Sequence, residues 1–289
     1  MADKEIDKLS GVETTGHEWD GLKELNNPLP RWWLWVFYAT VIWAVIYWIL
    51  MPSWPMLTDY TRGIRGQSQR AIVMQEVDAL KALRAEKGAG LADADLAEIQ
   101  QTPAMLEFAM ANGRSAFGDN CAPCHGSGGG GFTGYPNLND DAWLWGGSLD
   151  DIHQTLLYGI RSDHDETRFG DMPAFGRDEL LTPDEVFDVA NYVHSMAGMD
   201  TAADANLEEG KTLYMDNCAV CHGDEGKGMR ELGAPNLTDG IWMYGSDLDT
   251  IIDGINNGRG AVMPAWIDRL DPVTLKSLAV YTHSLGGGE

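Results

Sequence analysis

Two copies of one short motif contain all the cysteines of this 289-residue chain. The motif reads CAPCH at residues 121–125 and CAVCH at residues 218–222. In each copy, two thiols three positions apart can form thioethers with the vinyl groups of one haem, and the adjacent histidine can bind its iron. Zinc-binding and redox-active CxxC pairs do not require that histidine. We therefore predict two covalently bound haem c groups, attached through Cys121, Cys124, Cys218 and Cys221.

His125 and His222 are the first axial ligands that the motif supplies to the two irons. An electron-transfer haem normally has a second protein ligand. Met172 and Met263 are the candidates, because both lie in a Met-Pro-Ala context at matching places after the two motifs. A thioether is a soft ligand that stabilises ferrous iron, so we expect two relatively oxidising electron carriers. The sequence leaves open whether each methionine serves its own repeat's haem or the other one.

Other histidines offer an alternative set of axial ligands. His194 and His283 also match between the repeats and would give bis-histidine sites, although favourable contact with a helix C-terminus explains their positions equally. His153 and His164 have no counterpart in the second repeat, and His17 lies in the tail, so all three are weak ligand candidates.

Two further pairs of residues could support the haems. A metal-bound histidine usually donates its other ring N–H to an acceptor. In monohaem cytochromes c a proline carbonyl after the motif accepts it, and Pro136 and Pro235 stand at that place, where they could also only stiffen a loop. Arg161 and Arg259 could pair with haem propionates or be ordinary exposed arginines.

The two motifs belong to two copies of one domain. Trp143 matches Trp242, and residues 172–175 match 263–266. Each copy predicts a short helix entering the motif, a Gly-rich loop, a middle helix, a Met-Pro loop and a final helix, and no segment alternates as a strand would. The final helices begin at Thr182-Pro183 and Asp271-Pro272.

We therefore expect an all-α fold, with one N-terminal transmembrane helix followed by two tandem class I cytochrome c domains at 109–203 and 204–289. Residues 162–170 are an insertion in the first copy only, which could shield its haem, contact a partner or be a tolerated surface loop.

Residues 32–51 form an uncharged apolar segment, which as a helix would span about 30 Å, the thickness of a bilayer's hydrocarbon core. Tryptophans and tyrosines gather near both ends, and no small-residue cleavage site follows. We predict a membrane anchor here, preceded by a flexible cytoplasmic tail at 1–31. It is followed by a linker at 52–108 whose helical segment could lie on the membrane, on a partner subunit or on the chain itself.

Charge does not orient the anchor, because basic residues flank both of its ends. Covalent haem attachment does, since in bacteria it takes place outside the cytoplasmic membrane. We therefore place the haem domains in the periplasm, held by a single pass through the bacterial inner membrane. The formal net charge of -24 argues against nucleic-acid binding and fits either a soluble surface or steering of a cationic partner.

With these features together, the chain resembles the membrane-anchored dihaem cytochrome c subunit (subunit III) of cbb3-type cytochrome c oxidases. The resemblance covers residues 20–289 and rests on NPLPRWW at 27–33, Trp54-Pro55 and the two sets of CxxCH and Met-Pro residues. Some members of the family have two membrane helices, and this chain has one.

The resemblance implies that Met172 and Met263 are axial ligands. It further implies that the chain, together with a monohaem cytochrome c subunit, passes electrons from a soluble or membrane-bound cytochrome c donor to a haem-copper subunit that reduces oxygen. The chain is then not an enzyme by itself. The alternatives are a tethered carrier for another respiratory complex and a dihaem peroxidase, which would need an open sixth position at one haem.

Overall fold

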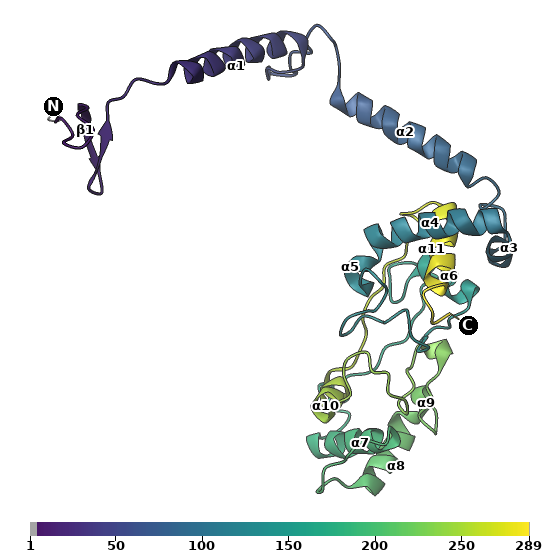
Figure 1. Ribbon diagram of the computed structural model, residues 1–289. Coiled ribbons are helices and arrows are strands. Elements are labelled where there is room, and N and C mark those ends of the chain that lie inside the picture. The colour runs from purple at the N-terminus through teal and green to yellow at the C-terminus, as the bar shows by residue number, and fades with distance from the viewer. Residues whose placement is uncertain (1–4, 289) are drawn as a thin grey trace. The chain divides into compact units, whose positions relative to one another are not determined.

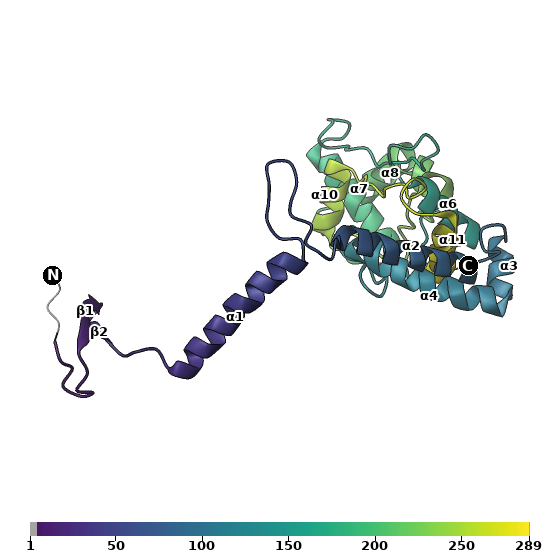
Figure 2. The ribbon, with the colours of Figure 1, turned by 90° about the horizontal axis from the view of Figure 1, so that it is seen from above.

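The computed structural model describes residues 5–288, which fall into two units divided after Leu83. The first unit holds a β-hairpin, the long helix α1 and most of helix α2 (Figure 1). The second unit holds the other helices, most of which are labelled in Figure 2. Both CxxCH motifs also lie in this unit.

The N-terminal segment forms an antiparallel hairpin of β1 (Thr14–Trp19) and β2 (Leu22–Leu25). The two residues of its turn, Asp20 and Gly21, have φ of 51° and 86°, and Asp-Gly is a preferred pair where both turn residues need positive φ. The expectation of a flexible tail is therefore wrong for residues 14–25.

Helix α1 (Arg31–Leu50) coincides with the predicted anchor. The mean hydropathy of its most apolar 18-residue stretch is 1.8, and no residue of that stretch is buried inside the protein. The helix begins after Pro30 and ends before Pro52, whose ring and missing N–H prevent its continuation. Among the described residues this is the one helix long and apolar enough to cross a membrane.

Helix α2 (Gln69–Lys87) is the helical segment expected in the linker, and no residue in it is buried. The helices that follow in the second unit are α3 (Leu96–Gln101), α4 (Pro103–Asn120), α5 (Ala122–His125), α6 (Leu149–Tyr158), α7 (Pro183–Met196), α8 (Leu207–Asn217), α9 (Ala219–His222), the 3₁₀ turn η1 (Arg230–Leu232), α10 (Leu248–Asn257) and α11 (Pro272–His283).

The final helices begin where the sequence predicts. Thr182 and Glu185 form a reciprocal capping box at the start of α7. At the start of α11 a carboxylate oxygen of Asp271 accepts a hydrogen bond of 3.0 Å from the backbone N–H of Thr274. Each cap satisfies an N–H group that the first turn of a helix leaves without a partner.

The second unit has two hydrophobic cores, and each combines segments from both sequence repeats. In the first lobe, α3, α4 and α6 pack with α11, which comes from the second repeat (Figure 1). In the second lobe, α8 and α10 pack with α7, which comes from the first repeat. The compact lobes therefore differ from the predicted domains at 109–203 and 204–289, because each takes its final helix from the other repeat.

The same helix crossing is built twice. A Cβ on Gly113 of α4 would lie 2.3 Å from the carbonyl oxygen of Ser277 in α11, and a Cβ on Gly210 of α8 would lie 2.3 Å from that of Asp188 in α7. Only glycine permits such an approach of two helix backbones. Beside each crossing an aromatic pair packs with its ring centroids 5.5 Å apart, Phe117 with Tyr281 and Tyr214 with Tyr192.

Candidate haem sites

Each CxxCH motif folds as a single helical turn, α5 or α9, which gathers its reactive groups. The backbone N–H of His125 donates to the carbonyl of Cys121, and that of His222 donates to the carbonyl of Cys218, both at 2.9 Å. The turn brings the two thiols and the imidazole of each copy close together, as attachment of one porphyrin requires.

The axial histidines have the predicted acceptors. The Nδ1–H of His125 donates to the carbonyl oxygen of Pro136 at 3.1 Å, and the Nδ1–H of His222 donates to that of Pro235 at 3.0 Å. A carbonyl can only accept, so Nδ1 carries the proton and Nε2 keeps its lone pair for a metal. Pro136 and Pro235 thus orient the imidazoles, in addition to stiffening their loops.

Burial sets the protonation of these groups. It lowers the pKa of His125 and of His222, while the proline carbonyls act in the opposite direction. Burial also raises the pKa of the Cys121 and Cys218 thiols to about 11. A thiol with so high a pKa is a poor redox nucleophile, which disfavours a redox role for these two cysteines.

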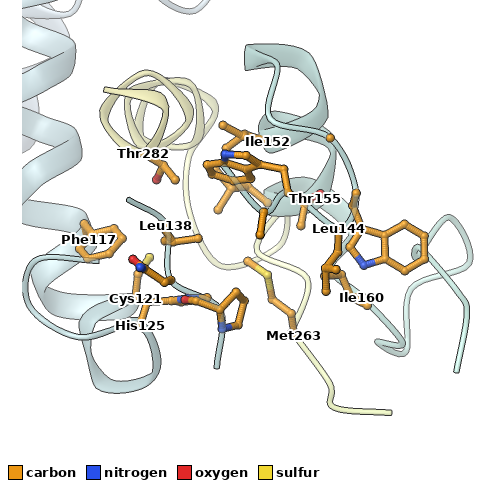
Figure 3. A pocket seen from close by; sticks show the side chains of 17 residues that line it. Phe117, Cys121, His125, Leu138, Leu144, Ile152, Thr155, Ile160, Met263 and Thr282 are labelled. Atoms are coloured by element: carbon orange, nitrogen blue, oxygen red, sulfur yellow. The ribbon is translucent and has the colours of Figure 1, made fainter. Parts of the chain in front are cut away.

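An apolar cleft lies beside the first motif and encloses about 720 Å³, counting its solvent-open part. Figure 3 shows Cys121 and His125 on one segment and Met263 on the pale yellow C-terminal segment, all around the same space. Apolar side chains, among them Phe117 and Ile152, make up most of the wall.

The two methionines lie in different lobes. Met263 of the second repeat lines the first cleft together with His125. Met172 of the first repeat packs against the second core, which includes Ala219 of the second motif and against which Cys218 also packs. The exchange of the final helices thus brings each methionine to the lobe that holds the other repeat's CxxCH motif.

Backbone hydrogen bonds hold both methionine loops. Met263 and Ile160 exchange two backbone bonds of 2.9 Å, and Met172 and Arg259 exchange bonds of 2.9 and 3.2 Å. Ile160 and Arg259 each follow a glycine with positive φ. A Cβ added to that glycine would lie 2.3 Å from the carbonyl oxygen of the methionine in the same hydrogen-bonded pair. These residues are Gly159 and Gly258, whose match between the repeats is visible in the sequence but whose role is not.

The arginines and the insertion take roles that the sequence does not reveal. Arg161 donates to the carbonyls of Ala261 and Gly170, and Arg259 donates to Asp253, so each guanidinium already has a partner in the protein. Within the insertion, Arg168 donates to the carbonyl of Trp145 at 2.8 Å. The insertion therefore packs against a wall of the first cleft.

The other histidines lie elsewhere. Both ring nitrogens of His194 face backbone carbonyls, those of Asp200 and Ser246. His283 is the half-buried last residue of α11, His164 packs on the Tyr158 ring with centroids 4.7 Å apart, and His153 lies in α6. His17 lies in β1 of the first unit. The contacts of His194 give no support to bis-histidine ligation.

The residues around the first cleft fit a haem. Its wall is apolar, the histidine's second nitrogen is satisfied, and the thioether of Met263 lies in the same cleft. The indole N–H of Trp143, which also lines the cleft, is buried and has no acceptor among the described residues. A buried donor without a partner is costly, and a cofactor carboxylate is an acceptor that could satisfy it.

Comparison with known families agrees with this geometry. Residues 11–58 match the family described as the N-terminal domain of cytochrome oxidase-cbb3, FixP. Residues 108–193 and 205–281 match the family described as cytochrome c oxidase, cbb3-type, subunit III. The chain belongs to the cbb3-type subunit III family. The two subunit III segments end inside α7 and α11, so each includes the helix that packs on the other lobe.

Curated relatives of this subunit III chain match it from end to end. A "Cbb3-type cytochrome c oxidase subunit FixP" of Bradyrhizobium sp. (strain ORS 278) is 56% identical, with 100% of both chains covered. A FixP subunit of Bradyrhizobium diazoefficiens is 55% identical over 99% of this chain and 98% of its own. A "Cbb3-type cytochrome c oxidase subunit CcoP" of Azospirillum brasilense is 50% identical, with full coverage of both.

Proposed function

We propose that this chain is the dihaem electron-transfer subunit of a cbb3-type cytochrome c oxidase. It would relay electrons from a soluble or membrane-bound cytochrome c donor towards the haem-copper subunit that reduces oxygen. The observation that carries the proposal is the carbonyl-bonded histidine in each CxxCH motif, together with the thioether of Met263 in the same apolar cleft as His125.

Two sets of residues would hold the two haems. Cys121 and Cys124 would bind the first covalently, with His125 and Met263 as its axial ligands. Cys218, Cys221, His222 and Met172 would hold the second. When bound, each haem supplies a reversible one-electron iron couple whose potential the thioether ligand raises. The protein's own part is to fix the imidazoles through Pro136 and Pro235 and to keep water from the first cleft with its apolar wall.

Oxygen chemistry would belong to another polypeptide. With Met263 and Met172 holding the sixth positions, neither iron would have a free position at which oxygen or peroxide could bind and react. The chain would therefore be a subunit of an oxidase without being an enzyme by itself. The expected partners are the haem-copper catalytic subunit and the monohaem cytochrome c subunit.

Helix α1 would anchor this subunit in the bacterial inner membrane. Its length of 20 residues matches the thickness of the bilayer core, and none of its residues is buried inside the protein. The haem lobes would then lie in the periplasm, and the hairpin of residues 14–25 in the cytoplasm.

Purification in a mild detergent tests the proposal. We expect the full chain to carry two thioether-linked haems by mass and to copurify with a haem-copper subunit. Carbon monoxide should bind the reduced isolated chain slowly and incompletely, because methionine occupies the sixth position. Rapid binding of one carbon monoxide per haem would contradict the closed coordination, and association with a different respiratory complex would contradict the oxidase assignment.

A further inference from the structure

The contact between the two lobes includes an aromatic ring that lines the first cleft and packs against the loop before Pro235 in the second lobe. Trp145 lines the first cleft and is 8% exposed. On the second lobe it packs against Gly233, where a Cβ would lie 2.2 Å from the indole ring. Gly233 has φ of 63°, so the glycine serves both the backbone conformation and the approach of the ring.

Gly233 is close to the iron site of the second lobe along the chain. It lies two residues before Pro235, whose carbonyl accepts the hydrogen bond from His222 at 3.0 Å. A continuous route therefore runs from the wall of the first cleft through the Trp145 ring and residues 233–235 to the axial histidine of the second site.

The opposite contact is built in the same way. Tyr244 stands at the position that matches Trp145, and a Cβ on Gly134 would lie 3.2 Å from its ring. Gly134 precedes Pro136, the acceptor of His125, by two residues. The guanidinium of Arg259, whose backbone holds Met172, lies 4.4 Å from the centre of the Tyr244 ring.

The insertion of the first repeat holds Trp145 in place. The guanidinium of Arg168 lies 5.7 Å from the centre of the indole ring and donates to the carbonyl of Trp145 at 2.8 Å. Its side chain is only 13% exposed. A Cβ on Gly170, the last residue of the insertion, would lie 3.4 Å from the same ring. The ring is thus confined by both lobes and by a segment that the second repeat lacks.

We propose that Trp145 is the contact through which electrons pass between the two haem sites, with Tyr244 as its counterpart. This inference rests on the proposed function. In each event one electron leaves the ferrous iron of one haem, which becomes ferric, and reduces the ferric iron of the other to ferrous. Trp145 provides the bonded and packed path, is itself neither oxidised nor reduced, and takes up no proton.

Flash photoreduction of the full chain in detergent tests the role of Trp145. A Met172→His background, with two imidazole ligands on the second iron, lowers that haem's potential and separates the two spectra. An electron captured by the second haem then moves to the first, and its rate is measured directly. We expect Trp145→Leu to slow this step about tenfold, equivalent to about 1.4 kcal/mol of activation free energy.

Three variants distinguish loss of the electron path through Trp145 from a general loss of packing. Trp145→Tyr, which introduces the residue that the second repeat uses, should keep most of the rate. Gly233→Ala should slow the step when Trp145 is present and add little to Trp145→Leu, because contacting residues are not additive. Phe108→Leu, which removes a ring packed on the first core beside Gly88, is the matched control and should leave the rate within twofold.

An unchanged rate in Trp145→Leu would overturn the inference, and so would an equal loss in Phe108→Leu. A loss fully explained by shifted midpoint potentials would also overturn it, so the potentials are titrated in each variant. If haem is not attached by thioethers at all, the proposed function fails first, and mass analysis of the same samples reveals this.

Discussion

Replacing Gly258 by alanine should release Met172 from its position in the second lobe. Gly258 has φ of 71°, and an added Cβ would lie 2.3 Å from the carbonyl oxygen of Met172. Ordinary contacts of a Cβ are no closer than 3.4 Å, so the two segments must separate by about an ångström. That separation breaks the pair of backbone hydrogen bonds between Met172 and Arg259.

Two contributions set the free-energy cost of Gly258→Ala. The left-handed backbone costs a non-glycine residue about 1–2 kcal/mol. Each lost backbone hydrogen bond costs about 0.5–1.5 kcal/mol. The second contribution alone, about 1–3 kcal/mol for two bonds, favours the open sixth position by roughly five- to 150-fold.

Carbon monoxide affinity of the second haem is the assay. We expect it to rise in Gly258→Ala, together with a weaker low-energy absorption from sulfur to iron. Gly198→Ala is the matched control, because Gly198 has φ of 73° but nothing within 4 Å of an added Cβ. It should lower stability without raising the affinity. Equal carbon monoxide affinity in the two variants would refute the reasoning.

Three further predictions concern stability. Lys276→Met should lower the free energy of unfolding by about 2–3 kcal/mol, because the ammonium donates hydrogen bonds to three backbone carbonyls before α3. The control Lys211→Met, at an exposed lysine, should leave the free energy of unfolding measured by chemical denaturation almost unchanged. Thr182→Ala should cost about 1 kcal/mol through loss of the capping box, and an unchanged denaturation midpoint would count against that cap. Burial first, and then the charge of Lys276, lowers the pKa of His153 below its ordinary 6.5. The unfolded chain then binds more protons below pH 6.5, so stability should fall as the pH falls through that value, and less so in His153→Gln; parallel profiles would contradict this.

The local geometry of the two motifs could be predicted because it depends on residues close together in the sequence. Both CxxCH motifs fold as one helical turn, and the proline after each lies close enough along the chain to meet the histidine. The Met-Pro context, repeated twice, marked the methionines by symmetry. These are short-range signals that tertiary packing does not override.

The exchange between the repeats could not be predicted in the same way. Gly113 would accept the backbone of α7 as readily as that of α11, because Gly210 and Tyr192 reproduce the crossing in the other lobe. Two interfaces built from the same residue types have similar energies. Which pairs form depends on the lengths and contacts of the segments between them, and periodicity in the sequence does not report these.

The N-terminal hairpin was missed for a different reason. Asp20-Gly21 is a strong turn signal, but the strands beside it are short and mostly exposed, so they lack the alternation of apolar and polar residues that marks a half-buried strand. Trp145 was missed because its function depends on Gly233, a contact between lobes that no local pattern encodes.

The assignment of each methionine to the other repeat's histidine is the central claim, and single-haem chains test it most directly. In a chain with Cys218 and Cys221 replaced by serine, only the haem at Cys121 and Cys124 can be attached. Met263→Leu should then abolish the low-energy absorption from sulfur to iron, and Met172→Leu should leave it intact. Loss of the band in Met172→Leu, with the band retained in Met263→Leu, would contradict the account.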